Sequence, residues 1–261
     1  MKKFILLILF FPLYLSAEKI QIQLLDNAPY TFVLKSESSK AYKVVNDQRA
    51  TQALTPWSTF KIANSLIALD LKLVKSLDEL LTYDKKKYPN QKWWPKRWYA
   101  KPINLDEAFE YSAVPIYQEI ASKINNQKMQ NYLDKFNYGN RDISSGIDTF
   151  WLNGSFKVSA KEQVDFLQRL YKNEFQVSNK ALKLLKEIML VEETKNYKLY
   201  AKTGGGHLKK GQVLGWYVGF VENKKGTHYF ALNIEGNDFT KTMQRRKSLA
   251  KEHLIKAGAL Y

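Results

Sequence analysis

The stretch PWSTFKIANSLIALDLKL, residues 56–73, decides the fold because it predicts the first long helix of the chain. Pro56 and Ser58 are typical of a helix start. Apolar residues then recur at helical spacing and predict a buried stripe, formed by Ile62, Leu66, Leu69 and Leu73. We therefore expect a helix over residues 57–73, with Ser58 in its first turn.

The segments on either side of this helix predict strands at both ends of the chain. Two β-like runs, residues 29–35 and 40–45, precede it, and the Ser-Glu-Ser-Ser between them favours a hairpin. Helical spacing dominates the middle of the chain, over residues 105–110, 115–124, 127–136, 160–173 and 179–190. Three strands and a last helix follow, over residues 196–203, 212–222, 227–235 and 241–257.

This order of elements predicts an α+β fold. We expect an antiparallel sheet built from both chain ends and flanked by helices, with a helical lobe over residues 75–190 inserted between them. A cleft between sheet and lobe is a natural place for a ligand. No internal repeat or long linker is present, so residues 18–261 are expected to form one domain.

The beginning of the chain is typical of a signal peptide. Two lysines and an apolar run over residues 4–15 are followed by the small residues Ser16 and Ala17. The run is shorter than the ~20 residues that span a bilayer, which favours cleavage before Glu18 over an uncleaved membrane anchor. We expect a signal peptide at residues 1–17 and a mature protein that is secreted to the periplasm, with no stable membrane anchor.

Composition excludes several classes of function. The 261 residues contain no cysteine, which removes disulfides, thiolate catalysis and thiolate metal sites, and we expect no metal. The net charge is +16, but the lysines are scattered and form no arginine-rich stripe, so nucleic acid is not an expected partner. Positive potential instead favours small anions near a cleft. The chain is expected to be a monomer or a homodimer.

The motif Ser58-Thr59-Phe60-Lys61 places a hydroxyl and an amine on one face of the predicted helix. A serine hydroxyl needs a nearby base and a site for an oxyanion before it becomes a nucleophile. A lysine is such a base only when burial or neighbouring groups destabilise its ammonium form. The motif is short, and the alternative is a helix cap followed by a solvated lysine.

Three further motifs follow in order. Ser112-Ala113-Val114 lies between apolar residues at a predicted helix start. Tyr138-Gly139-Asn140 follows a helix and by itself indicates a turn, with Gly139 or Asn140 in the left-handed conformation. Lys202-Thr203-Gly204 ends a predicted strand. A charge and a hydroxyl there suit a carboxylate, and the alternative is an edge-strand lysine before a glycine turn.

The combination of motifs resembles the class D (oxacillinase-type) serine β-lactamases. Ser-x-x-Lys and Lys-Thr-Gly are shared with class A β-lactamases and penicillin-binding proteins, whereas Tyr-Gly-Asn and the surroundings of Trp151 favour class D. The resemblance extends from Tyr30 to the C-terminal helix and includes PWSTFKIANSLIALD, YSAVPIYQEIA, FNYGN, FWLNGSFKVSAKEQVDFLQRLY, LYAKTGGG and GWYVGFVE. It implies hydrolysis of the β-lactam ring of penicillin-type antibiotics, and hence antibiotic resistance.

The resemblance implies that Ser58 attacks the β-lactam carbonyl and is acylated. It further implies that carbon dioxide, supplied by bicarbonate, carboxylates Lys61 to give the general base for acylation and deacylation, with no other cofactor. Carboxylation needs an uncharged amine and therefore an apolar pocket, to which Phe60, Val114 and Trp151 are expected to contribute. The indole N–H of Trp151 would donate to the carbamate, and the alternative for this residue is a plain core tryptophan.

The remaining roles also follow from the resemblance. Ser112 passes a proton to the leaving nitrogen, and the backbone N–H groups of Ser58 and Gly205 form an oxyanion hole. The substrate is bound by the Lys-Thr-Gly strand and the final helix, through Lys202, Thr203, Gly204, Gly205 and Arg246. Arg245 is the alternative to Arg246, and either residue alone could be a solvated helix arginine.

Two features bear on the substrate side chain. Gly205, Gly206 and His207 stand where members of the family often have a bulky aromatic residue, so the preferred antibiotic stays open, and His207 is read as a surface residue. A group of aromatic residues either packs in the core, which is favoured, or lines the mouth of the cleft: Trp93, Trp94, Trp98 and Tyr99.

Three other functions are compatible with parts of the sequence. A β-lactam sensor domain shares Ser-Thr-Phe-Lys but hangs from several membrane spans, and only a short leader is expected here. A cell-wall transpeptidase or carboxypeptidase shares Ser-x-x-Lys and Lys-Thr-Gly. A basic surface-binding protein would explain the charge but none of the motifs.

Overall fold

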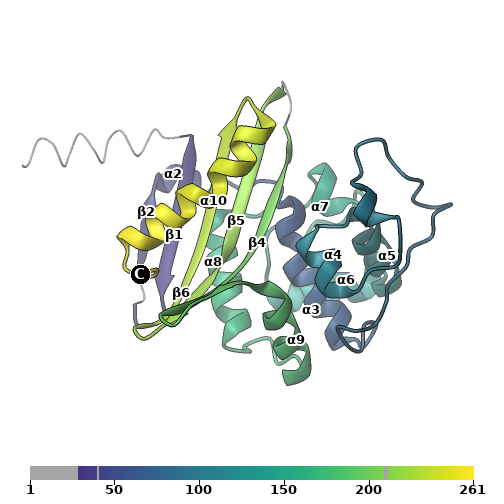
Figure 1. Ribbon diagram of the computed structural model, residues 1–261, viewed down its shortest axis with the longest axis horizontal. Coiled ribbons are helices and arrows are strands. Elements are labelled where there is room, and N and C mark those ends of the chain that lie inside the picture. The colour runs from purple at the N-terminus through teal and green to yellow at the C-terminus, as the bar shows by residue number, and fades with distance from the viewer. Residues whose placement is uncertain (1–28, 40, 209–210) are drawn as a thin grey trace, which may run out of the picture.

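Strands from both ends of the chain form one six-stranded antiparallel sheet in the order β2-β1-β6-β5-β4-β3 (Figure 1). This computed structural model describes residues 29–39, 41–208 and 211–261, so the predicted signal peptide lies outside the described residues. The strands are β1 (Tyr30–Ser36), β2 (Tyr42–Val45), β3 (Leu190–Glu193), β4 (Tyr197–His207), β5 (Val213–Asn223) and β6 (Gly226–Gly236). The predicted fold class is confirmed.

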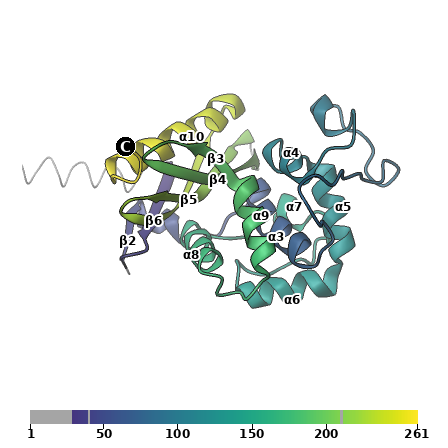
Figure 2. The same ribbon diagram turned by 60° about the horizontal axis from the view of Figure 1, so that its bottom comes forward.

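Helices cover both faces of this sheet (Figure 2). Helix α10 (Phe239–Lys256) packs on one face, and α8 (Ala160–Tyr171) packs on the other. The helical lobe lies beside β4 (Figure 1) and contains α3 (Lys61–Asp70), α4 (Leu105–Glu110), α5 (Val114–Ile124), α6 (Asn126–Phe136), α7 (Phe150–Asn153) and α9 (Asn179–Met189). Short turns are α2 (Asp47–Ala50), η1 (Trp57–Phe60) and η2 (Lys96–Trp98).

Two hydrophobic cores follow from this arrangement. Phe32 and Leu34 of β1 belong to the core beneath α10, whereas Val33 between them belongs to the core shared with the lobe. Alternate strand residues point to opposite faces of a sheet, and both faces are covered here. β5 is therefore buried continuously from Val213 to Val221, which explains why its sequence is apolar throughout and does not alternate.

The predicted helix over residues 57–73 begins as the 3-10 turn η1 and continues as α3 to Asp70. Every residue from Lys61 to Leu69 is buried, so α3 runs through the core and the predicted apolar stripe is only part of its buried surface. Asp70 anchors the end of the helix. Its carboxylate accepts hydrogen bonds from the Tyr132 hydroxyl at 2.6 Å and the Ser178 backbone N–H at 2.8 Å.

The structure corrects the predicted end of the strand at residue 203. β4 continues through residues 204–206 to His207, and each residue pairs with β5. Three glycines in a row are typical of a turn, but here they allow close approach of another segment. A Cβ on Gly204 would lie 2.6 Å from the carbonyl oxygen of Pro56. β3 pairs only with residues 198–200, so along the described chain no strand flanks the outer edge of β4 beyond them.

Gly219 of β5 tests how tightly the centre of the sheet is packed. A Cβ there would lie 2.8 Å from the Cα of Ala201, whereas one at Gly215 would meet only side-chain atoms, at 3.2 Å or more. We expect Gly219→Ala to lower the free energy of unfolding by roughly 1–3 kcal/mol through overpacking, seen as a Tm lower by roughly 2–12 °C. Gly215→Ala is the matched control with a smaller loss, and equal losses in thermal unfolding would contradict the prediction.

Candidate active site

Four side chains from distant parts of the chain meet where the helical lobe contacts β4. Ser58 lies in η1, and Lys61 begins α3 one turn later, with its Nζ 3.2 Å from Oγ of Ser58. Ser112, in the turn between α4 and α5, accepts a hydrogen bond of 2.6 Å from Nζ of Lys202 on β4. The two pairs are close enough for the charge of Lys61 to lower the pKa of Lys202. The structure thus brings together the four polar residues that the motifs predict.

Complete burial of Lys61 determines its chemistry. Burial penalises the charged form of an amine and lowers the pKa of Lys61 to about 7. The alternative of a solvated lysine is therefore wrong. An amine that titrates near neutral pH, 3.2 Å from a serine hydroxyl, is able to accept the proton of that hydroxyl.

Tyr117 is a neighbour of this amine that the motifs did not indicate. Its buried ring lies with the centroid 4.8 Å from Nζ of Lys61, and its hydroxyl shares a hydrogen bond of 2.8 Å with Ser65. Tyr117 is three residues after Val114 on α5, so helical spacing from the Ser-x-Val motif was the signal that could have found it.

Lys202 is the second buried amine of the site. Burial, followed by the positive charges of Lys61 and Arg246, holds the pKa of Lys202 well below its usual value. Its Nζ also lies 5.2 Å from the ring centroid of Phe109. Because neighbouring positive charges add to the cost of ionising Lys202, a bound anion would stabilise its charged form.

The turn that carries Ser112 is held in a strained conformation. Ser112 has φ 57°, in the left-handed region, which costs roughly 1–2 kcal/mol for a residue with a Cβ. Its N–H donates to the Phe109 carbonyl at 3.2 Å, and the indole N–H of Trp98 donates to the Tyr111 carbonyl at 2.9 Å. These bonds fix the turn so that the Ser112 hydroxyl faces Lys202.

Trp151 and Val114 belong to the apolar surroundings of the site. Trp151 is completely buried in α7 and stacks on Phe60, with ring centroids 5.6 Å apart. Val114 is half-buried at the start of α5 and packs against the same core. The indole N–H of Trp151 is buried and has no hydrogen-bond partner within the described protein. Buried donors are normally paired, so this N–H is available to a group bound beside it.

Arg246 is the arginine of α10 that reaches the site. Its Nη1 donates to the Gly204 carbonyl at 2.5 Å, and burial lowers the pKa of its guanidinium to about 10. Arg245 is exposed and forms an ion pair of 2.5 Å with Glu252. The choice of Arg246 over Arg245 thus agrees with the position of both residues. Thr203 is half-buried on the same strand segment.

The Tyr138-Gly139-Asn140 motif is a turn that supports η1. Gly139 has φ 59°, so the predicted left-handed residue is the glycine. The Tyr138 hydroxyl donates to Oε1 of Gln163 at 2.7 Å, and Nε2 of Gln163 donates to Oγ1 of Thr59 at 2.9 Å. All three side chains are buried. The motif therefore positions the residue next to Ser58, through a glutamine that no sequence signal singled out.

The aromatic residues near the cleft divide into two kinds. Trp94 and Trp98 are 7% and 6% exposed, which agrees with the packing interpretation, whereas Trp93 is 65% exposed. His207 at the end of β4 is exposed and stacks on Phe239 of α10, with centroids 5.2 Å apart. This agrees with its interpretation as a surface residue.

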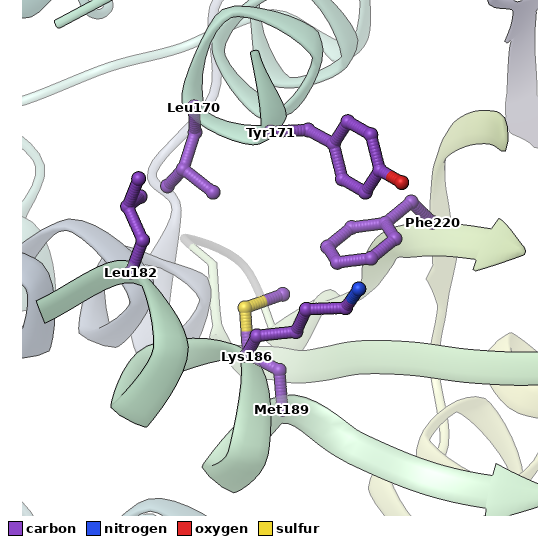
Figure 3. Close-up of a pocket in the computed structure, with 6 residues that line it drawn as sticks. All are labelled: Leu170, Tyr171, Leu182, Lys186, Met189 and Phe220. Carbon is purple, nitrogen blue, oxygen red and sulfur yellow. The ribbon is translucent and has the colours of Figure 1, made fainter. Parts of the chain in front are cut away.

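A cavity of about 310 Å³ lies between α8, α9 and β5 (Figure 3), and none of the motif residues is among those that line it. Its walls are formed by Leu170, Tyr171, Leu182, Lys186, Met189 and Phe220. The two polar groups of the wall already have a hydrogen-bond partner. Nζ of Lys186 and the hydroxyl of Tyr171 both donate to Oε1 of Glu222, at 2.5 and 2.8 Å. The cavity is therefore not the centre of the chemistry.

The family model of the penicillin binding protein transpeptidase domain matches residues 27–255. Among curated proteins, the chain is 40% identical over 203 residues to β-lactamase OXA-48 of Klebsiella pneumoniae, covering 78% of this chain and 74% of the relative. It is 33% identical over 217 residues to the methicillin resistance mecR1 protein of Staphylococcus aureus, covering 81% of this chain but 36% of the relative.

Solved structures give the same comparison in three dimensions. A crystal structure of a class D β-lactamase from Sebaldella termitidis superposes with a TM-score of 0.83 at 33% sequence identity, covering 94% of this chain and 97% of the other. Sequence and fold are therefore both similar to class D β-lactamases over most of the described chain.

Replacing Ser112 by two different residues separates its backbone strain from its hydroxyl. Ser112→Ala and Ser112→Gly both remove the partner of Lys202, but only glycine adopts φ 57° without the steric cost of a Cβ. We expect Ser112→Gly to be more stable than Ser112→Ala by about 1 kcal/mol in urea unfolding. Equal stability of the two variants would show that this turn is not strained.

The burial of Lys61 predicts a pH-dependent stability. The unfolded chain keeps a proton on this amine up to its ordinary pKa of 10.5, whereas the folded protein releases it near pH 7. The unfolded state therefore binds more protons between these values, and stability rises with pH across this window. Lys61→Met lacks this dependence, so we expect it to exceed the wild type in stability by a few kcal/mol at pH 7.

Chemical unfolding of both proteins from pH 7 to pH 10, in buffer freed of carbon dioxide, measures this difference, which should shrink as the pH rises. Lys183→Met, at an exposed position of α9, is the matched control and should follow the wild type. A constant difference between wild type and Lys61→Met would mean that Lys61 ionises normally in the folded protein.

Proposed function

Because this chain belongs to the class D β-lactamases, we propose that it hydrolyses the β-lactam ring of penicillin-type antibiotics through an acyl-enzyme on Ser58, and so confers antibiotic resistance. The observation that carries this proposal is the buried amine of Lys61, with a pKa near 7, at 3.2 Å from Oγ of Ser58. A serine beside a base of this kind is an activated nucleophile.

Acylation forms one bond and breaks another. Oγ of Ser58 bonds to the β-lactam carbonyl carbon while its proton passes to the base at Lys61. The C–N bond of the ring then breaks, and the ring nitrogen receives a proton from Ser112, whose hydroxyl is hydrogen-bonded to Lys202. Ser112 regains a proton from the base at Lys61, which is thereby free for the second step. The backbone N–H groups of Ser58 and Gly205 stabilise the oxyanion. Attack of water on the ester, assisted by the same base, releases the product.

The substrate carboxylate is expected to bind at β4 and α10. Lys202, Thr203 and Arg246 offer two cations and a hydroxyl there. The backbone of Gly204 and Gly205 lies beside them, and the Gly204 carbonyl accepts a hydrogen bond from Arg246. Burial and then the positive charges of Lys61 and Arg246 lower the pKa of Lys202, which supports this, since a bound carboxylate would offset those charges.

We further propose that carbon dioxide carboxylates Lys61. The residues present fit such a group: the amine is neutral near pH 7, and the buried N–H of Trp151 lacks a partner. Phe60 and Val114 contribute the apolar surroundings that keep the amine uncharged. Once bound, the group supplies a carboxylate-type base in place of the amine. The indole N–H of Trp151 would orient the carbamate by hydrogen bonding, and the burial of Trp151 keeps bulk water away from it.

A β-lactam sensor is the second candidate function. The observation that favours it is the similarity to the mecR1 protein, of which this chain covers 36%. A sensor stays acylated, whereas an enzyme turns over.

Periplasmic location after cleavage of residues 1–17 is also part of our proposal. Within the described chain, no helix has the length and apolarity needed to cross a membrane.

Turnover of the chromogenic β-lactam nitrocefin, with and without bicarbonate, tests the proposed function. We expect steady turnover that bicarbonate increases in protein first depleted of carbon dioxide. Lys61→Ala should slow deacylation far more than acylation, because it removes the proposed carbamate, the base that activates water against the acyl-enzyme. A single stoichiometric burst, with no steady rate in either buffer, would identify a sensor or a penicillin-binding protein.

Trp151→Phe tests the carbamate separately from the fold. The change keeps an aromatic ring in the core but removes the unpaired N–H, so we expect a bicarbonate requirement raised by about 10–100-fold. Trp94→Phe removes another buried indole N–H without a partner and is the matched control. An unchanged bicarbonate dependence in Trp151→Phe would show that the indole N–H of Trp151 does not stabilise the carbamate.

A further inference from the structure

Trp57, the residue before Ser58, adopts a backbone conformation that large residues avoid. Its φ is 53°, in the left-handed region, where the Cβ crowds the backbone at a cost of roughly 1–2 kcal/mol. Strain of this kind persists only where the surrounding structure holds it in place. The question is therefore what holds Trp57.

Gly206 of β4 provides the contact that holds this side chain. A Cβ at Gly206 would lie 2.5 Å from Cε2 and Cζ2 of Trp57, so the indole lies directly on the strand backbone. The indole N–H is buried without a hydrogen-bond partner among the described residues. Packing alone therefore fixes the ring, and the indole excludes any side chain at position 206.

This contact connects the two halves of the proposed oxyanion hole. The two proposed donors are the backbone N–H groups of Ser58 and Gly205. Trp57 directly precedes Ser58 in the chain, and Gly206 directly follows Gly205. Gly204 lies on the same face of β4 as Gly206, two residues earlier. There the strand meets the backbone at the start of η1, since a Cβ would lie 2.6 Å from the carbonyl oxygen of its N-cap residue, Pro56.

Two successive contacts thus hold η1 against β4, a backbone contact at Gly204 and a side-chain contact at Gly206. The first fixes the closest approach of the two segments. At the second, the indole fills the space between the two segments. The ring therefore determines the distance between η1 and the part of β4 that follows residue 204.

We propose that Trp57 is a positioning residue, a wedge whose indole against Gly206 sets the separation of the two oxyanion-hole N–H groups. This inference rests on the proposed acylation of Ser58. A hydrogen-bond pair aimed at a developing charge loses much of its effect when one donor moves. The wedge therefore acts on the transition state more than on the bound substrate.

Four proteins test the wedge: the wild type, Trp57→Ala, Gly206→Ala and the double variant. Rate constants for acylation of Ser58 by benzylpenicillin are followed by mass, together with kcat and KM. We expect Trp57→Ala to lower the acylation rate constant about tenfold with KM changed by less than about threefold. Gly206→Ala should lose at least about tenfold, because its methyl group and the indole cannot both fit.

The double variant is decisive. If the methyl group of Gly206→Ala collides with the indole, removing the indole should remove that loss. The double variant should then be acylated about as fast as Trp57→Ala alone, and faster than two independent, multiplied losses would allow. Gly204→Ala is the matched control: its methyl group would meet Pro56 and Thr59, so adding Trp57→Ala should not rescue it. Thermal unfolding of each variant shows whether rates recover independently of stability.

Multiplicative losses in the double variant, equal rescue of Gly204→Ala, or a Trp57→Ala protein with wild-type rate constants would each overturn the wedge. Acylation rates can be compared even in a protein that never releases its product. A failure of steady hydrolysis would therefore contradict the proposed enzyme without deciding the role of Trp57.

Discussion

Removal of one amine, that of Lys61, from water is the constraint on which the rest of the site depends. A lysine on a surface helix keeps its charge and cannot accept the proton of a serine. Here α3 is buried along its whole length up to Leu69, so the amine has no path to solvent along its own helix. Helices α5 and α9 of the lobe pack against this helix, and the large core offsets the free-energy cost of the buried amine, a few kcal/mol.

Strain in the site is concentrated at two residues that adjoin reacting groups. Trp57 precedes the nucleophile and Ser112 contacts Lys202, and both have left-handed backbone conformations. Each is held by a contact from outside its own turn: the indole of Trp57 packs on Gly206, and the indole of Trp98 donates a hydrogen bond to the residue before Ser112. Such positions persist where packing over-determines them, and they fix side chains more firmly than relaxed turns do.

Positive charge at the site has a local and a general component. Burial lowers the pKa of Lys61, Lys202 and Arg246, and the charges of Lys61 and Arg246 lower that of Lys202 further, beside a substrate position that takes a carboxylate in our proposal. The chain as a whole carries +16, spread over scattered lysines. The general field attracts small anions toward the protein, whereas the buried group determines where an anion is stabilised.

The sequence by itself determined the elements whose signals are local. Helical spacing placed α4 at residues 105–110, the hairpin and the late strands were found within a few residues, and three short motifs identified Ser58, Lys61, Ser112 and Lys202. Only the tertiary structure decided that β4 continues through three glycines, because their conformation depends on how closely η1 approaches. It also supplied Tyr117, Gln163 and the wedge at Trp57. Contacts such as those of Gln163 with Thr59 and of Trp57 with Gly206 join segments far apart in the chain and leave no periodic signal in the sequence, since burial and approach distance are properties of the packed chain and not of any one segment.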